Sequence, residues 1–447
     1  MAGDLPRSLL SVAVARATLE PVSAKNFTSP LQRIIVSLYP ILGASGKFAQ
    51  SPPCDAAFGE VLAFDHLSQE RLVSLLTTFV AYPSQQSELQ ESDPAVRSFI
   101  RDCAAPLLEE MGARFSYDQM GNLVLDAGPK GTGRSILFVG YAMTHPGAAM
   151  SDPFTPKVIE TARGQAVRGR GVAEQKTALA ALFGALGAAL AEGRLEGQLI
   201  FALTTAGETG RHDAVASVMQ MLADKPACAV VCIGTDNRVA IGNKGRVDFD
   251  IFVHGKASHS SAPWNGVNAI NGAQHVLQQI EALDLDVADH PAFGPATLTP
   301  TAIDSSPKAT HTVPDTVRMT FDRRLLPGES PEAAYEAIRG RVSVDSPWSL
   351  SFRRGPVMFP NELALDGPLF KKLHTAFSRA GQRELASFHC NFALDAGYFS
   401  RNGIEAVMLG PGEVDQFHSN EEQVLVADLV HMANVYYQLI RCSVGPS

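Results

Sequence analysis

The stretch Gly169-Arg170-Gly171-Val172-Ala173-Glu174-Gln175-Lys176-Thr177 stands directly before an Ala/Leu-rich segment, residues 178–191. Because Ala and Leu favour helices, this segment predicts a helix that begins close to Glu174. An acidic side chain there has two interpretations. It is either an ordinary acid stabilised by the helix dipole or a ligand for a cation. The surrounding sequence decides between them in favour of the ligand.

Three further polar residues follow predicted buried strands. Glu208 comes after the apolar run 199–203 and Asp236 after 229–233, and His418 follows the run 406–410. The carboxyl ends of strands in an open α/β sheet form the edge where ligands bind. Carboxylates and an imidazole at that edge suit a divalent transition metal. The alternative for Asp236 is a residue that merely begins a turn.

Composition limits the class of protein. The chain has 447 residues, of which 45% are hydrophobic and 19% charged, as in ordinary soluble globular proteins of two or three domains. A net charge of −9 argues against nucleic-acid binding, and no apolar run is long enough to span a membrane. The six cysteines include no Cys-x-x-Cys pair, and the N-terminus lacks a secretory signal pattern. We therefore expect reduced thiols and a cytoplasmic location.

The order of predicted elements divides the chain. Residues 66–243 alternate strands and helices, which predicts an α/β domain with a mostly parallel sheet. Residues 244–358 predict the order β-α-β-β-α-β of a ferredoxin-like unit, with alternating strands of which one face stays open. The α/β pattern returns at residues 359–447. One domain is therefore interrupted by another, and residues 1–65 are interpreted as an N-terminal appendage.

Several short motifs follow one another along the chain. They are, in chain order, Asp152-Pro153-Phe154, Gly169 to Lys176, Glu208 with Gly210, Gly255 to His259, Pro263 to Ile270, Val313-Pro314-Asp315, Asp322-Arg323-Arg324, Pro327-Gly328-Glu329, and Gly410-Pro411-Gly412 with His418. Together they resemble the co-catalytic metallopeptidase family of glutamate carboxypeptidase, acetylornithine deacetylase and succinyl-diaminopimelate desuccinylase, from about residue 72 onward. This resemblance implies a zinc-peptidase-like catalytic domain with an inserted dimerisation lid. It also implies a homodimer, and a divalent metal such as zinc, manganese or cobalt.

The metal-binding positions depart from the family pattern. The family has His-x-Asp where this chain has Tyr141-Ala142-Met143, and its bridging Asp corresponds to Glu174. By resemblance, one metal position keeps Glu174, Glu208 and His418. The other keeps Glu174 and Asp236 but has lost its His. Three protein ligands suffice for a catalytic metal, so we expect one tightly bound ion per subunit.

The general base of the family is also missing. Where the family has Glu-Glu, this chain has Gly207-Glu208, and we expect the glycine to leave a gap the size of a carboxylate side chain. Candidates for the replacement base are Glu174, His212, His145 and a metal-bound hydroxide. For His145 and His212 the alternative is a simple surface or supporting histidine.

The remaining site residues are implied by the resemblance. His259 reaches the neighbouring subunit's active site and stabilises oxyanion charge, Arg324 holds a substrate carboxylate, and Asn268 supports the same pocket. An arginine fork matches a carboxylate bidentately. For His259 the alternative is an ordinary histidine of a hairpin. For Arg324 it is an ion pair with Asp322 on the face of the sheet. Tyr141 is either a core residue or a phenol donor at the site.

These observations predict a metal-dependent hydrolase of a carbon–nitrogen bond in a small, carboxylate-bearing substrate. The chemistry would resemble an amidohydrolase, deacylase or deaminase more than an ordinary peptidase. The alternative is a non-catalytic binding protein that retained the fold, for which Gly207 and Tyr141 are typical. Retained carboxylates argue against it, because they would repel one another without a cation.

Overall fold

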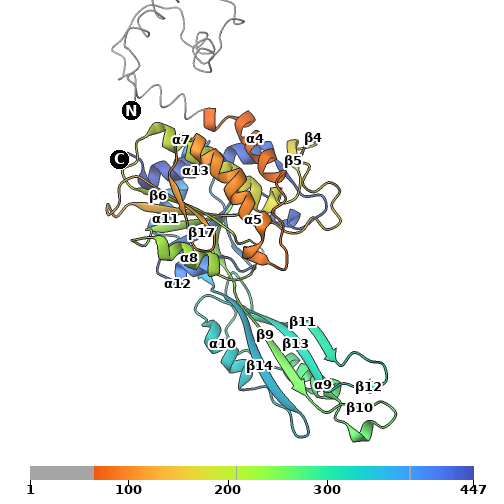
Figure 1. Ribbon diagram of the computed structural model, residues 1–447. Coiled ribbons are helices and arrows are strands. Elements are labelled where there is room, and N and C mark those ends of the chain that lie inside the picture. The colour runs from red at the N-terminus through yellow and green to blue at the C-terminus, as the bar shows by residue number, and fades with distance from the viewer. Residues whose placement is uncertain (1–64, 208, 382–383, 447) are drawn as a thin grey trace, which may run out of the picture. The chain divides into compact units, whose positions relative to one another are not determined.

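The computed structural model describes residues 65–207, 209–381 and 384–446 (Figure 1). All but the last residue of the predicted N-terminal appendage, residues 1–65, therefore lies outside the described residues. So does the predicted ligand Glu208.

The larger sheet has nine strands, and its centre is parallel. β6, β3, β7 and β17 run in the same direction, whereas β1, β2, β8 and β15 join them in antiparallel pairs. The expectation of a parallel sheet thus holds for the centre only. The strands, from one edge to the other, are β1 (Phe115–Tyr117), β2 (Leu123–Ala127), β6 (Gln198–Thr204), β3 (Ser135–Tyr141), β7 (Cys228–Cys232), β17 (Glu405–Leu409), β8 (Val239–Asn243) and β15 (Asn361–Glu362), with β16 (Ser387–Cys390) beside β8.

Helices cover both faces of this sheet (Figure 1). On one face, α7 is buried along most of its length because small residues let neighbours approach closely. A Cβ atom at Gly184 would lie 2.5 Å from the Leu72 side chain of α4. The first face carries α4 (Gln69–Val80), a helical segment from Pro94 to Glu110, α7 (Thr177–Glu192), α11 (Pro368–Arg379) and α13 (Val426–Val444), and the second carries α8 (Asp213–Met221) and α12 (Ala396–Arg401).

A small antiparallel sheet, which the sequence did not predict, brings together the two loops of the candidate site. β5 (Gly164–Arg168) pairs with β4 (Lys157–Thr161) and with β18 (Gln423–Leu425) in antiparallel fashion. Because Arg168 lies opposite Gln423, the loop that precedes α7 is brought against the loop that follows β17.

The inserted unit has the predicted β-α-β-β-α-β order. Its antiparallel sheet is arranged β11-β13-β9-β14, and the alternating residues of β9 and β13 are buried under two helices. The boundaries 244–358 stay a prediction. The elements are β9 (Gly245–His254), α9 (Ala269–Glu281), β11 (Thr297–Ser306), β13 (Thr316–Leu325), α10 (Pro331–Arg339) and β14 (Ser349–Met358), with a short hairpin of β10 (Ser258–His259) and β12 (Thr312–Val313).

Candidate functional site

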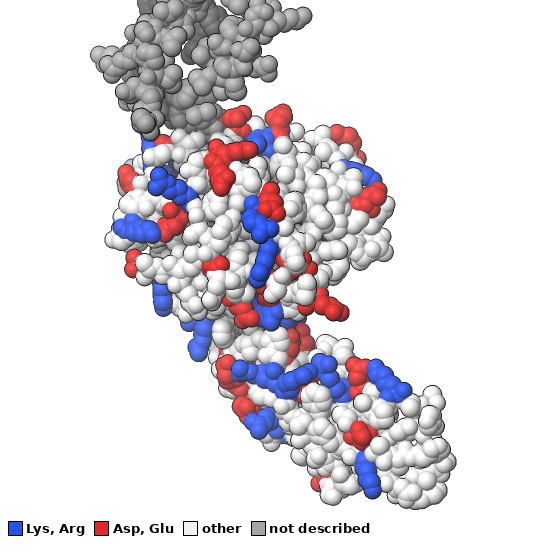
Figure 2. All heavy atoms as spheres, viewed as in Figure 1, with Lys and Arg blue, Asp and Glu red and all other residues white. Residues whose placement is uncertain are grey.

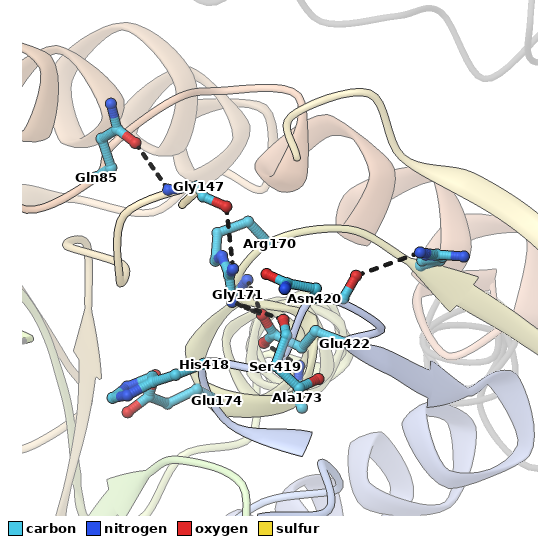
Figure 3. A network of polar contacts seen from close by, with 11 residues as sticks. Gln85, Gly147, Arg170, Gly171, Ala173, Glu174, His418, Ser419, Asn420 and Glu422 are labelled. Carbon is cyan, nitrogen blue, oxygen red and sulfur yellow. Dashed lines mark hydrogen bonds and ion pairs between the residues drawn. The ribbon is translucent and has the colours of Figure 1, made fainter. Parts of the chain in front are cut away.

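Glu174 and His418 lie side by side at the carboxyl edge of the central strands (Figure 3). Glu174 belongs to the helical turn Val172–Lys176 before α7, and His418 lies in the loop after β17 with a backbone φ of +60°. Their Oε2 and Nε2 atoms are 3.2 Å apart. The glutamate side chain is 11% exposed and the imidazole 43% exposed. An oxygen atom and a nitrogen atom that could both ligate a metal thus lie next to each other, in a position that solvent can reach.

A buried ion pair holds the two loops together. Arg170 and Glu422 are both inaccessible to solvent, and their Nη1 and Oε2 atoms are 3.0 Å apart. Glu422 also accepts the amides of Gly171 at 3.0 Å and Ala173 at 2.9 Å, while Arg170 donates to the Ser419 carbonyl at 3.1 Å (Figure 3). Burial raises the pKa of Glu422, and the amides and Arg170 oppose that rise. No pattern in the sequence assigned a role to either residue, although Arg170 lies within the stretch Gly169–Thr177.

His145 covers one face of His418. The two rings stack with centroids 3.8 Å apart and planes inclined by 11°. Nitrogen lone pairs lie in the plane of each ring, so two parallel stacked rings direct them along separate planes. In this arrangement His145 packs on His418, and its role as a replacement base stays a prediction.

Asp236 makes other contacts. Its Oδ1 accepts the Val414 amide at 2.7 Å, and its Oδ2 is paired with Arg238. Its backbone lies in the left-handed region at φ +57°, as does that of Asn237. Asp236 is therefore neutralised by an arginine of its own turn. Whether it also binds a metal stays a prediction.

The gap expected at Gly207 does not exist. A Cβ atom there would lie 2.3 Å from the carbonyl oxygen of Met143, which is far inside van der Waals contact. The loop after β6 runs against the strand end after β3, and Met143 donates its amide to the Ala206 carbonyl at 3.2 Å. The expectation of open space was wrong because the glycine permits a close approach of two backbones.

Tyr141 belongs to a buried chain of hydrogen bonds. Its hydroxyl donates to Asp395 Oδ2 at 2.7 Å, and Asp395 Oδ1 lies 2.6 Å from His212 Nδ1. The His212 Nε2 accepts the Phe359 amide at 3.0 Å. Burial, together with Asp395, raises the pKa of Tyr141 well above its ordinary value. Both ring nitrogens of His212 are thus engaged, and its predicted role as a base stays untested. No pattern in the sequence identified Asp395.

His259, Arg324 and Asn268 make their hydrogen bonds inside the inserted unit, as far as the described residues extend. His259 is exposed on the β10–β12 hairpin and bonds Ser261 at 2.7 Å. Arg324 holds Asp322 with two hydrogen bonds of 2.8 and 3.0 Å. Asn268 caps the N-terminus of α9. Their roles toward a substrate or a partner subunit stay predictions.

The two predicted metal positions differ in how far their side chains already make other contacts. Across residues 65–207, 209–381 and 384–446, no three His, Cys, Asp or Glu side chains are gathered as a metal site. Glu174 and His418 supply two of the three predicted ligands, and Glu208 is the third. At the second position the Tyr141 hydroxyl already bonds Asp395, and Asp236 is paired with Arg238. An ion at the second position would have to compete with these contacts, and the expected count of one ion per subunit stays a prediction.

Comparisons with known sequences identify relatives. Residues 241–349 match the peptidase dimerisation domain of the M20 type. A peptidase M20 domain-containing protein of Schizosaccharomyces pombe is 24% identical over 290 residues, which are 65% of this chain and 66% of that protein. Acetylornithine deacetylase of Myxococcus xanthus is 29% identical over 321 residues, 69% of this chain and 80% of the relative. The chain thus spans about two-thirds of the first relative and more of the second.

Solved structures share the fold. A tripeptidase from Staphylococcus aureus superposes with a TM-score of 0.68 at 17% identity, covering 84% of this chain and 98% of that one. Bacillus subtilis YXEP, described as a dinuclear metal-binding peptidase from the M20 family, gives 0.58 at 14% identity, covering 83% and 97%. The expected family resemblance and the expected fold, an α/β domain interrupted by a unit that matches a peptidase dimerisation domain, are confirmed.

Proposed function

We propose that the protein, a relative of the M20 peptidases with their dimerisation domain, hydrolyses a carbon–nitrogen bond in a small, carboxylate-bearing molecule. The observation that carries the proposal is the Glu174–His418 pair, whose oxygen and nitrogen donors lie 3.2 Å apart in a partly exposed position. We expect a single zinc, manganese or cobalt ion, held by these two residues and Glu208. When bound, such an ion polarises a carbonyl and lowers the pKa of water.

The chain's own residues orient this site. The Arg170–Glu422 pair fixes the loops that carry Glu174 and His418, and His145 packs on the imidazole. For the proton transfer, Glu174 and His145 are better candidates than His212, whose Nε2 already accepts a backbone amide.

The substrate contacts rest on resemblance. Arg324 would bind the substrate carboxylate. Its guanidinium now donates two hydrogen bonds to Asp322, so the substrate would have to share that guanidinium with Asp322 or displace it. Asn268 would support this pocket, and His259 of one subunit would stabilise the oxyanion in the other. Tyr141 would act through Asp395, since its hydroxyl is not free to donate to a substrate.

The proposed assembly is a homodimer formed through the inserted unit. The match to a peptidase dimerisation domain supports it, and so does the exposed edge strand β11. Figure 2 shows basic and acidic side chains intermingled on the visible face, which does not favour a nucleic-acid partner. In the described part of the chain, none of the helices has the length and apolar character that crossing a bilayer requires.

We also propose a cytoplasmic location. The cysteines in the described residues are free thiols, as expected in a reducing compartment. Four of these five are buried, so their reduced state also suits the packing of the core.

A second candidate function, non-catalytic binding, is favoured by three observations. The Tyr141 hydroxyl donates its hydrogen bond to Asp395, and Asp236 forms an ion pair with Arg238. Gly207 lies so close to the Met143 carbonyl that a glutamate would not fit there. A protein of this kind would bind a small ligand at the same edge without turnover.

Metal analysis separates these functions. Purified protein supplied with zinc, manganese or cobalt should retain about one ion per subunit. His418→Ala and Glu174→Gln should lose that ion, whereas His374→Ala, a change of an exposed histidine on α11, should keep it. A wild type that binds no metal, or a His418→Ala variant that keeps it stoichiometrically, would contradict the proposed site. Release of free amino acid from N-acyl amino acids and dipeptides then tests catalysis.

A further inference from the structure

The buried chain Tyr141–Asp395–His212 ends at a backbone amide. We propose that this chain of hydrogen bonds is a protonation-sensitive latch. Neutral His212 accepts a hydrogen bond from the Phe359 amide, and protonation of His212 breaks it. This would release the crossing, by which we mean the two segments near Asn243 and Phe359 that connect the large-sheet domain with the inserted unit. The latch uses neither metal nor substrate, so it stands independently of the proposed hydrolase function.

Phe359 lies where the chain returns from the inserted unit. It stands between β14, which ends at Met358, and β15, which begins at Asn361 in the large sheet. Its carbonyl accepts Nδ2 of Asn243, the last residue of β8 before the chain leaves for β9. The outgoing and returning segments are thus tied to each other at Phe359. A bond to the Phe359 amide fixes both at once.

The direction of each hydrogen bond assigns the tautomer of His212. A backbone amide can only donate, so Nε2 of His212 must be an acceptor without a proton. Nδ1 then carries the proton and donates it to Asp395 Oδ1 at 2.6 Å. The other Asp395 oxygen is occupied by the Tyr141 hydroxyl at 2.7 Å, which holds the carboxylate in place. The histidine is therefore neutral while the latch is closed.

Protonation would put two donors opposite each other. An Nε2–H group cannot accept the Phe359 amide, so the 3.0 Å contact would become repulsive. The imidazolium would still be stabilised by Asp395, and it would contact the stacked ring of Phe359 and the tilted ring of Tyr398, whose centroids are 5.3 and 5.4 Å away. Histidine is the side chain that changes charge between pH 5 and 8. Protonation of His212 would therefore release the crossing.

Other charged groups surround His212, and Arg401 of α12 lies over the Phe359 ring that stacks on it. Arg211 and Asp213 flank it in the chain, and Glu332 and Arg354 of the inserted unit line the same 570 Å³ cavity. Each of the two arginines is paired with an acid, Arg211 with Glu91 at 2.8 Å and Arg354 with Glu332 at 3.4 Å. Asp395 is the charged group that bonds the His212 ring directly, with Oδ1 2.6 Å from Nδ1.

Hydrogen exchange of the Phe359 amide in the full-length, metal-free protein tests the latch. Pro360 has no amide, so short peptides that span residues 357–361 report few sites. After correction for intrinsic exchange, protection should fall about tenfold between pH 8 and pH 5, the change expected on losing one buried hydrogen bond. His212→Gln should show no such fall, because a glutamine oxygen accepts the amide at every pH. Thermal melts at both pH values exclude global unfolding.

Asp395→Asn provides the second variant. It keeps an acceptor for Nδ1 but removes the negative charge, so the loss of protection should move to lower pH. Nitrogen-15 shifts of His212 should report an unprotonated Nε2 at neutral pH. Protection that is independent of pH in the wild type, an equal fall in His212→Gln, or a protonated Nε2 at neutral pH would each overturn the latch.

Discussion

Arg170 and Glu422 are separated by 252 positions in the chain, yet their Nη1 and Oε2 atoms lie 3.0 Å apart with both side chains excluded from solvent. The glutamate also accepts two backbone amides of the turn that carries Glu174. Because the partner loop carries His418, this pair links the two loops that carry the candidate metal ligands. A local motif and a distant carboxylate thus build the site together.

Breaking this pair should be costly. Glu422→Ala leaves a buried guanidinium without its counter-charge, so the free energy of unfolding should fall by about 3–5 kcal/mol. Urea denaturation measures it. Arg163→Ala breaks the exposed pair of Arg163 with Glu413 and should cost no more than about 1 kcal/mol. Equal effects of the two changes would show that the buried pair has no special structural role.

Side chains at Gly207 should strain the fold. Gly207→Ala places a Cβ atom 2.3 Å from the Met143 carbonyl oxygen, and we expect a loss of about 1–3 kcal/mol in unfolding free energy. Gly340→Ala is the control, since its Cβ atom would lie 3.4 Å from the nearest atom. Gly207→Glu should be at least as unstable and should not restore a base. Wild-type stability in Gly207→Ala would refute the close contact.

Stability should depend on pH through Lys176. This lysine is buried, donates to Ser84 Oγ at 2.8 Å and lies over the Phe99 ring, and burial lowers its pKa to about 7. Between pH 7 and the ordinary lysine pKa, the unfolded chain binds the extra proton. The contribution of Lys176 to the free energy of unfolding therefore rises with pH, by up to about 1.4 kcal/mol per pH unit.

Comparison with Lys176→Met measures this contribution. The unfolding free energy of the wild type minus that of the variant should increase from pH 7 to pH 9.5 in urea titrations. Lys371→Met, which changes an exposed lysine on α11, should follow the wild type at every pH. A difference between wild type and Lys176→Met that stays constant over this range would contradict the lowered pKa.

The dimer hypothesis allows a complementation test. If His259 acts in the partner's site, His259→Ala and His418→Ala should each be inactive, while a 1:1 mixture after subunit exchange should regain about a quarter of wild-type activity. Half of the dimers are then mixed, and each mixed dimer has one intact site. Activity is followed with whichever N-acyl amino acid or dipeptide the wild type cleaves. A dimer that regains nothing on exchange would place His259 outside the neighbouring site.

The local pattern of apolar residues identified most elements of the fold. The Ala- and Leu-rich sequence on both sides of Gly184 predicted α7. The alternation of apolar and polar residues in Val247–Val253 predicted β9, because a strand buried on one face has an apolar residue at every second position. It did not identify short strands such as β4, β5 and β18, which carry little apolar sequence and form through pairing with distant partners.

The sequence by itself determined which residue types are present at the candidate site: Glu174 and His418 with metal-binding chemistry, Tyr141 in place of a histidine, and Gly207 in place of a carboxylate. Only the tertiary structure decided what each of them contacts. Tyr141 reaches Asp395 across 254 positions, and Gly207 lies against the backbone of Met143. Such contacts depend on how strands from distant parts of the chain pair and end, which no local spacing records.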